Sequence, residues 1–316
     1  MRKFIVAALV VACAAAGALG QSQSAPTLRI IAEDGNKLPA ELMYGNTKVK
    51  PLRLRPGTNT PITIKDTDFF VQQQYVDFLG RFPDQGGFAF WQGNITQCGN
   101  DQGCIDAQRV NVSAAFFLSI EFKESGFLVY RTHRAAFGNL PGKPVPVVRE
   151  NFIPESRSIA ADVIVGTDGW QARLQNNKNA YMLAFVQRSD FRALYPSSLT
   201  PEQFVDGLNA KAGNVLDAAE RAALIGELTA NNTDAGRASV LLKVAEDGTL
   251  HQRELNSAFV FMQYVGYLKR NPSDPPDADF AGFNFWLDKL NQFNGDFVRA
   301  EMVRAFLDSI EYNARF

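Results

Sequence analysis

The run Phe70-Val-Gln-Gln-Gln-Tyr-Val-Asp-Phe-Leu-Gly-Arg81 recurs near the other end of the chain as Phe259-Val-Phe-Met-Gln-Tyr-Val-Gly-Tyr-Leu-Lys-Arg270, with seven of twelve positions identical. In both runs, aromatic and aliphatic residues return at close to helical spacing, which predicts a helix with one apolar face. Each run is soon followed by X-Pro, at Pro83 and Pro272. Because the residue before proline avoids the helical region, the two helices should stop in the same way.

Two further matches follow these runs in the same order. Gly87-Phe-Ala-Phe-Trp91 matches Gly282-Phe-Asn-Phe-Trp286 at four of five positions. Ala115-Phe-Phe-Leu-Ser-Ile-Glu-Phe122 matches Ala305-Phe-Leu-Asp-Ser-Ile-Glu-Tyr312 at five of eight positions. Three blocks in one order indicate an internal duplication. They predict a second helix that carries the Trp, and a third helix that ends at Ser-Ile-Glu-Phe/Tyr.

Weaker copies are predicted between these two. Leu128–Pro141 repeats the apolar pattern and the Gly/Pro ending of the first block, and Ala184–Phe191 closes that copy. Another copy, without the Trp, runs from Phe204 to Glu246. We therefore predict a mainly α fold, an array of short helical hairpins packed on one another, with a short N-terminal β or extended segment. The expected repeats span 69–122, 127–191, 200–250 and 256–316.

The first twenty residues have the layout of a cleavable secretory signal. A basic start precedes an uncharged run, and Ala18-Leu-Gly20 offers small residues at the two positions that a signal peptidase reads. The run is shorter than the roughly 20 residues that a spanning helix needs. We expect residues 1–20 to be removed, leaving an extracytoplasmic product (secreted, periplasmic or surface-bound) without a transmembrane segment. Lipidation at Cys13, in the lipobox-like run Val10-Val-Ala-Cys13, is the alternative.

Residues 21–68 differ in composition from the rest of the chain. They are rich in proline and contain short alternating stretches at Leu28–Ala32 and Pro61–Lys65, with turn signals at Asp34-Gly35 and Pro56-Gly57. These features predict short strands or an extended arm. A segment with so few apolar positions seldom folds as an independent domain. We therefore expect the arm to lie against the helices.

Cleavage would leave two cysteines, Cys98 and Cys104, separated by a polar, Gly-containing segment. An even count in an oxidising compartment predicts a disulfide. A loop this small contributes roughly 2 kcal/mol, so it would tether a loop without holding the fold. With two histidines in the whole chain, a zinc site lacks ligands.

The charge balance argues against a nucleic-acid partner. Of 32 basic residues, Arg2 and Lys3 would leave with the signal, so 30 would face 33 acidic residues, a net charge of −3. Such a surface has no basic field to hold nucleic acid or anionic lipid. With 46% hydrophobic residues the chain can bury a large core.

The three blocks together resemble the bacterial domain-of-unknown-function 4214 family. The similarity is clear at 69–122 and 259–312 and fainter from 127 to 247. This resemblance implies a helical fold similar to the linker domains of phycobilisomes, found in exported and surface proteins. Some relatives carry calcium-binding glycine-rich repeats, but Gly-Gly-x-Gly-x-Asp is missing here, so calcium-driven secretion is not implied. The family supplies no catalytic residues to carry over.

Four residues with catalytic side chains favour structural roles. His133 and His251 have no neighbouring Ser, Cys or ligand pattern, and a triad needs partners that only the fold could supply. Glu121 and Glu311 fall at matching places of separate repeats, which fits a salt bridge or a helix-end hydrogen bond better than acid–base chemistry.

A weak calcium pattern and three tryptophans complete the candidates. Asp277, Asp279 and Asp288 partly follow a calcium loop, although helix capping by Asp279 is the favoured interpretation. Trp91 and Trp286, with their Phe neighbours, are expected in the core rather than on a sugar- or protein-binding surface. Trp170, which has no repeat partner, is the better candidate for exposure.

The sequence therefore predicts an exported, non-catalytic interaction or scaffold protein of the cell envelope or extracellular space. It would act through the surface of a helical-repeat array, on an unknown protein or an envelope polysaccharide. No cofactor motif, nucleophile motif or nucleotide-binding glycine loop points to an enzyme. The alternatives are a secreted hydrolase of cell-wall or polysaccharide material, whose site assembles from scattered residues, and a carbohydrate-binding protein.

Overall fold

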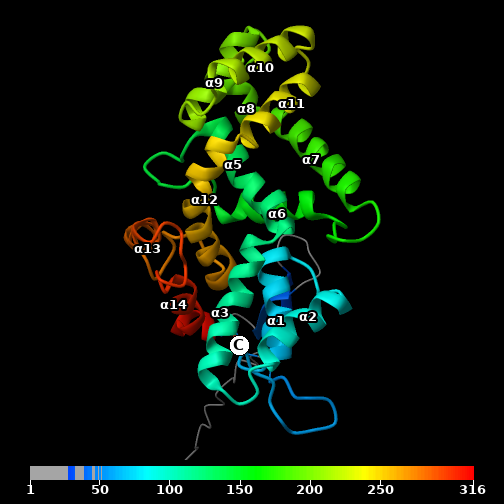
Figure 1. The fold of residues 1–316 in the computed structure, drawn as a ribbon, viewed down its shortest axis with the longest axis vertical. Coiled ribbons are helices and arrows are strands. Elements are labelled where there is room, and N and C mark those ends of the chain that lie inside the picture. The colour runs from blue at the N-terminus through cyan, green and yellow to red at the C-terminus, as the bar shows by residue number, and fades with distance from the viewer. Residues whose placement is uncertain (1–27, 33–38, 45–46, 49, 51) are drawn as a thin grey trace, which may run out of the picture.

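The computed structural model describes residues 28–32, 39–44, 47–48, 50 and 52–316. The expected signal peptide at 1–20 and Cys13 lie outside these residues. As predicted, the described part of the chain is mainly helical, with a short β segment before the helices. Figure 1 shows the helices of both chain ends gathered at one end of an elongated body, α8 to α11 at the other end, and α5 to α7 between them.

The first and last repeats contain the same sequence of elements. In each, a helix passes into a π-helical turn and is followed by the Trp-bearing helix, a third helix and a short terminal helix. The bounds in the first repeat are α1 (Thr67–Gln74), η1 (Tyr75–Leu79), α2 (Gln85–Thr96), α3 (Gln102–Leu118) and α4 (Ile120–Glu124). Those in the last are α12 (Gly248–Met262), η2 (Gln263–Leu268), α13 (Ala281–Gln292), α14 (Met302–Asp308) and α15 (Ile310–Asn313).

The predicted first helix differs from the observed one at its end. It finishes in the π turn, and a residue with left-handed backbone follows directly: Gly80 (φ 65°) in the first repeat and Lys269 (φ 58°) in the last. A left-handed residue ends many helices. The helix therefore ends before the X-Pro sequence, and the proline is not what stops it.

The third block was predicted to be one helix, but the structure divides it into two helices. The third helices end at Leu118 and Asp308, and after one serine a new helix begins at Ile120 and at Ile310. Ser119 Oγ accepts a hydrogen bond from the backbone N–H of Phe122 (3.1 Å), and Ser309 Oγ accepts one from Tyr312 (3.1 Å). The serine of Ser-Ile-Glu is thus an N-cap, and not the end of the preceding helix.

The inner helices show parallels to these two repeats. α3 and α7 both have 17 residues, and each is followed within one or two residues by a short helix whose N-cap, Ser119 or Arg188, has extended backbone. The inner first helices also end at residues of positive φ, Gly138 and Gly213. The inner repeat boundaries stay predictions. The inner helices are α5 (Gly126–Phe137), α6 (Arg149–Ala160), α7 (Trp170–Val186), α8 (Ser189–Leu194), α9 (Pro201–Ala212), α10 (Ala218–Ala230) and α11 (Asp234–Ala245).

The N-terminal segment contains β1 (Leu28–Ala32), β2 (Pro39–Tyr44) and β3 (Thr47–Lys48), which form an antiparallel sheet in that order. The first predicted strand is confirmed. Pro61–Lys65 is not a strand, and only a single bridge joins Pro61 to Leu54.

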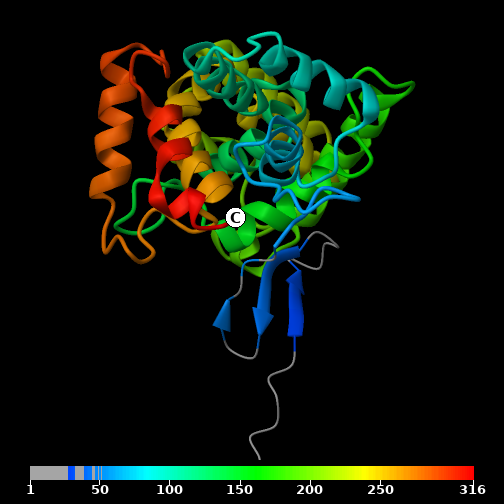
Figure 2. The same cartoon turned by 90° about the horizontal axis from the view of Figure 1, so that it is seen from below.

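This arm meets the helices only in part. Arg109 of α3 donates hydrogen bonds to the carbonyl oxygens of Ile64 (2.9 Å) and Lys65 (3.1 Å), and Ile64 is buried. Figure 2 shows the sheet standing off to one side of the helical body. The expectation that the arm lies against the helices therefore fits residues near Ile64 and not the sheet.

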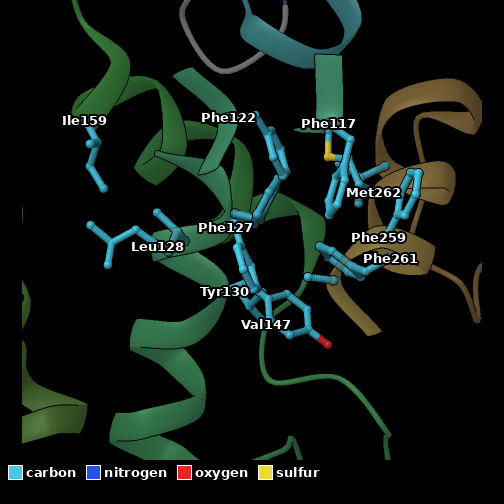
Figure 3. Packing of buried hydrophobic residues seen from close by; sticks show 14 of the residues in the cluster. Phe117, Phe122, Phe127, Leu128, Tyr130, Val147, Ile159, Phe259, Phe261 and Met262 are labelled. Atoms are coloured by element: carbon cyan, nitrogen blue, oxygen red, sulfur yellow. The ribbon is translucent and has the colours of Figure 1, made fainter. Parts of the chain in front are cut away.

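The core runs through the contact between the two chain ends and α5. Ten of the twelve residues of α5 are buried, so this helix is enclosed on nearly all sides. Phe117 of α3 stacks on Phe259 of α12 with ring centroids 4.1 Å apart, and Tyr130 of α5 packs on Phe261 at 5.6 Å (Figure 3). Aromatic side chains thus join the first repeat, the last repeat and the central helix.

Candidate functional site

Residues that recur in the first and last repeats fall into two groups, and only one of them is explained by packing. In the first group, Arg81 donates to both carboxylate oxygens of Glu121 (2.9 Å each). Arg270 does the same to Glu311 (2.6 and 3.0 Å). The prediction that these glutamates are structural is confirmed: each ties the end of its π turn to the short terminal helix of the same repeat.

The glycine of the Gly-Phe-x-Phe-Trp motif also belongs to the packing group. A Cβ atom at Gly87 would lie 2.2 Å from the hydroxyl oxygen of Tyr75, and one at Gly282 would lie 2.7 Å from that of Tyr264. The two tyrosines are buried. The repeated glycine is therefore required by the repeated tyrosine, and it needs no ligand to explain it.

Trp91 and Trp286 were predicted to be buried in the core, but they are only partly buried. Trp91 and Trp286 are half-buried, with ring centroids 5.6 Å from Phe116 and 5.8 Å from Phe306. One face of each indole packs on the core while the rest reaches the surface. Trp170, expected to be exposed, is half-buried as well.

The second group is repeated and exposed. Phe90 is 60% exposed and its counterpart Phe285 is 57% exposed, although both were expected to pack inward. Ile120 is 50% exposed and its counterpart Ile310 is 89% exposed. Each exposed Phe ring lies edge-on to the neighbouring Trp, with centroids 4.8 and 5.0 Å apart. We call Phe90, Ile120, Phe285 and Ile310 the repeated exposed residues.

These residues lie in two places. Figures 1 and 2 show α2, which carries Phe90, and α13, which carries Phe285, on opposite flanks of the body. The two exposed Phe side chains therefore do not form one line of aromatics along which a single sugar chain could stack. They mark two equivalent apolar sites, one on each repeat.

The two sites differ in their surroundings. In the first repeat Phe82 and Leu118 are also exposed, whereas Asn271 and Asp308 take their places in the last. Asn271 Oδ1 accepts a hydrogen bond from the backbone N–H of Arg149 (2.7 Å), so α6 covers this position in the last repeat. The first repeat thus exposes Phe82 and Leu118 beside its repeated residues, whereas the last repeat exposes Val298.

The calcium candidates do not meet. Asp277 accepts a hydrogen bond from Arg270 (2.9 Å), Asp279 accepts one from the backbone N–H of Ala281 (2.8 Å), and Asp288 is exposed on α13. Asp279 thus binds the first backbone N–H of α13, but the N-cap is Phe280 and not Asp279, so the predicted cap is displaced by one residue. Over the described ranges, no three His, Cys, Asp or Glu side chains gather where they could hold a metal ion.

Cys98 and Cys104 stand in the loop between α2 and α3 and in the first turn of α3. Their sulfur atoms are within bonding distance, and their Cα atoms are 5.5 Å apart, in the range of a disulfide. The loop joins the Trp-bearing helix to the third helix of the first repeat.

His133 is buried, whereas His251 is half-buried. His133 Nε2 is 2.7 Å from Glu155, which also accepts hydrogen bonds from Tyr181 (2.6 Å) and Arg188 (2.8 Å). Burial alone would raise the pKa of Glu155, but these partners hold it below its usual range. His251 packs on Phe127 at 4.9 Å, and burial lowers its pKa. Sequence reasoning missed the Glu155 cluster because its members are far apart along the chain.

A buried carboxylate, Asp77, lies at the contact between the first and last repeats. Arg315 donates to both of its oxygens (2.7 and 2.8 Å) and Lys269 lies 3.0 Å away. Burial would raise the pKa of Asp77, but the charges of Arg315 and Lys269 hold it below its usual range. The adjacent cavity has about 20 Å³, room for about one water molecule. A substrate does not fit there.

A groove of about 490 Å³ runs between α7 and α11. Its floor contains Met182 and Leu242, and its rim contains amides, Lys243 and Glu246. None of its lining residues is aromatic, so it offers no ring on which a sugar could stack.

No protein-family model matches the chain, and no match to it exists among the curated proteins or the solved structures that were compared. Within the part of the chain that the structure describes, each helix is too short or too polar to span a bilayer.

Proposed function

We propose that this chain is an exported, non-catalytic interaction or scaffold protein of the cell envelope or extracellular space, acting through the surface of its helical repeats. The observation that carries the proposal is that Phe90 and Ile120 recur as Phe285 and Ile310 while remaining exposed in both repeats. The resemblance to the domain-of-unknown-function 4214 family and the signal-like residues 1–20 support the same proposal.

The physical argument rests on what packing leaves unexplained. Single exposed apolar residues are common on protein surfaces and need no account. Here the same two residue types are exposed at matching positions of two repeats that have diverged at many others. Exposed aromatic side chains are frequent anchors of protein–protein interfaces, because they bury a large area at a small entropic cost.

The location of the two sites favours a scaffold. Since α2 and α13 lie on opposite flanks (Figure 1), one small partner cannot cover both. Two equivalent sites that face apart suit a protein that holds two partner molecules, or two segments of one large partner, at a fixed separation.

The alternatives draw less support. A secreted hydrolase needs a polar cleft with an accessible carboxylate. Asp77 and Glu155 have lowered pKa values; Asp77 is buried between Arg315 and Lys269, and the half-buried Glu155 has its oxygens bound by His133, Tyr181 and Arg188. A carbohydrate-binding protein would suit exposed aromatics, yet Phe90 and Phe285 lie on separate flanks.

The test compares partner capture by matched variants of the exported protein. Phe90→Ser and Phe285→Ser together should abolish capture of protein partners from the native envelope, without lowering the melting temperature by more than a few degrees. Leu194→Ser is the control, because Leu194 is similarly exposed (49%) but lies outside the first and last repeats. Capture that survives the double change, or that is lost equally in the Leu194 variant, contradicts the proposal. Binding to isolated wall polysaccharide that depends on Phe90 would favour the carbohydrate-binding alternative.

A further inference from the structure

The third helices of the four predicted repeats can be aligned through one basic residue. It stands ten residues before the N-cap of the next helix each time: Arg109 before Ser119, Lys178 before Arg188, Arg237 before Asp247 and Arg299 before Ser309. Arg109 and Arg237 also have the same role, since each donates hydrogen bonds to backbone carbonyl oxygens of the segment before its repeat's first helix and lies over a Phe ring. This register aligns α3, α7, α11 and α14 residue by residue.

Two surface grooves occupy equivalent places in this alignment. The outer groove lies between α3 and the segment that leads into α14, and it has about 260 Å³. The inner groove lies between α7 and α11, and it has about 490 Å³. Three lining positions correspond directly: Phe297, Glu301 and Arg304 in the outer groove, and Ala235, Ser239 and Leu242 in the inner groove. The inner groove is therefore hollowed where a ring and two long charged side chains are replaced by smaller or apolar ones.

The chemistry of the inner groove favours an uncharged, aliphatic ligand. Leu183, on its α7 side, is 38% exposed and has no aromatic neighbour in the lining. The two charged lining residues are already paired, Lys243 with Glu227 and Glu246 with the buried Lys178 (2.8 Å). A charge taken out of water without a partner is costly. A charged ligand group would thus have to break one of these pairs.

The rim of the inner groove offers one donor and one acceptor. Gln175 Nε2 donates a hydrogen bond to Asn179 Oδ1 (2.9 Å), and both side chains are exposed on α7. The side-chain oxygen of Gln175 and the side-chain amide nitrogen of Asn179 remain for a ligand. A peptide group presents the complementary N–H and C=O. The rim therefore suits the backbone of a polypeptide in extended form.

The length and the openness of the groove point the same way. Its α11 side runs from Ala235 to Glu246, a helical rise of about 16 Å, which equals about five residues of extended chain. The groove is open to solvent along its side, whereas sites for small molecules bury about 70–90% of the ligand. A protein segment can cover the open side with its own remaining surface.

We propose that the inner groove binds an extended, uncharged segment of a protein partner, about five residues long, with aliphatic side chains. These side chains would enter the space over Ala235, where Phe297 stands in the outer groove, and the backbone would bind Gln175 and Asn179. No residue of α2 or α13 lines the groove. The inference therefore goes beyond the proposed function, which concerns the repeated exposed residues, and the two can fail separately.

The test titrates the purified exported protein with a synthetic peptide of about five residues, capped at both ends, in which leucine alternates with serine. Isothermal titration calorimetry should show saturable binding below about 1 mM. Ala235→Phe should weaken binding at least about tenfold, because it restores the ring of the outer groove, and Leu183→Ser should weaken it about threefold or more. The same peptide with glutamate or lysine in place of serine should bind at least about tenfold more weakly.

The matched control is Ala184→Phe, because Ala184 is exposed on α7 beside Leu183 but does not line the groove. It should bind the peptide like the parent, and the melting temperature of each variant checks that it folds. No binding up to about 1 mM overturns the inference, as does binding that resists both groove variants or is lost in the control. Binding of octanoylglycerol without the peptide would also overturn it, because the groove would then hold a lipid-like molecule.

The outcomes for the two proposals are distinct. If the peptide does not bind but the Phe90→Ser and Phe285→Ser changes still abolish partner capture, the inference fails and the proposed function stands. If the peptide binds in the groove while capture is insensitive to those changes, the inference stands and the proposed function fails.

Discussion

Asp77 and Lys269 lie 3.0 Å apart, carboxylate oxygen to ammonium nitrogen, although each occupies a position where the other repeat has glycine. Asp77 corresponds to Gly266 and Lys269 to Gly80. Phe78 and Tyr267, which also correspond, meet edge to face at 5.0 Å beside this pair. Equivalent residues in mutual contact indicate a two-fold relation between the repeats. The charges favour pairing of a first with a last repeat. Two first repeats would place two aspartates at this contact without a lysine, and two last repeats would place two lysines there without an aspartate.

Replacement of Asp77 by Asn should therefore be strongly destabilising. The change removes the buried carboxylate and leaves the positive charges of Arg315 and Lys269 in place. Breaking one side of a buried ion pair costs about 3–5 kcal/mol, and urea unfolding of the purified protein measures it. The second change Lys269→Gly, which restores the residue of the first repeat, should recover part of the loss. A single variant as stable as the parent would show that Asp77 does not hold the repeats together.

Gln74 and Gln263 occupy the same position of the two repeats, but their replacement should change the free energy of unfolding in opposite directions. Gln74 accepts a hydrogen bond from the Ser113 hydroxyl (2.5 Å) and donates one to Tyr312 (3.4 Å). The equivalent Gln263 is also buried, but Val303 and Phe122 stand where those partners would be, and its Oε1 atom has no partner in the described part of the chain.

Gln263→Met should consequently raise the free energy of unfolding by about 1 kcal/mol, because it removes an unsatisfied buried acceptor. Its side-chain donor is dispensable, since the carbonyl oxygen of Phe259 keeps a backbone hydrogen bond. Gln74→Met should lower the free energy of unfolding by about 1–3 kcal/mol, because the Tyr312 hydroxyl loses its donor and the Ser113 hydroxyl, which keeps its contact with Tyr267, loses its acceptor. Equal effects at the two positions would contradict this account.

The glycine of the Gly-Phe-x-Phe-Trp motif can be tested through its tyrosine. Gly87→Ala should destabilise the protein by about 1–3 kcal/mol, because the new methyl group would overlap the Tyr75 hydroxyl. Tyr75→Phe removes that hydroxyl, so the double variant should lose less than the sum of the two single changes. Thermal unfolding of the four proteins gives the coupling. Additive losses would mean that the glycine is kept for another reason.

The sequence revealed the duplicated parts of this fold because the repeated residues obey packing rules. The helix that begins near Phe70 and the Trp-bearing helix follow from periodicity and from turn residues, and the matching places of Glu121 and Glu311 indicated a structural role without naming their arginine partners. The π turns did not, since a shift in backbone hydrogen bonding leaves the side-chain pattern almost unchanged. The helix after Ser119 could have been found, because a serine before Ile-Glu fits an N-cap.

The candidate site was harder to predict for a physical reason. A repeated Phe is apolar whether it faces the core or the solvent, and the sequence does not show on which side Phe88 and Phe90 lie. The clusters at Asp77 and Glu155 join residues that are distant along the chain, such as Asp77 and Arg315. Only the packing of whole repeats brings such residues together.

The Glu155 cluster should make stability depend on pH in the acid range. Its pKa is held below the usual value in the folded protein, so the unfolded chain takes up a proton first, near pH 4.3. The stabilisation is complete above that value and is lost as the pH falls through the folded pKa. Glu155→Gln should thus be clearly less stable than the parent at pH 7, and the difference should shrink by pH 3. Denaturant unfolding at both pH values measures this, and a difference that grows on acidification would contradict it.

The last prediction separates the two adjacent aromatic residues of α13. Trp286 is half-buried against Phe306, so Trp286→Ala removes core packing and leaves a partly filled space. We expect a loss of about 2–3 kcal/mol, below the 3–5 kcal/mol typical of fully buried aromatics. Phe285 is mostly exposed, so Phe285→Ala should cost less than about 1 kcal/mol. Phe283→Ala, at a buried position of the same helix, is the internal standard and should cost the full 3–5 kcal/mol. Chemical denaturation ranks the three variants. If Phe285→Ala lowered the free energy of unfolding as much as Phe283→Ala, the Phe285 ring would contribute to core packing. That result would contradict a binding role for the repeated exposed residues.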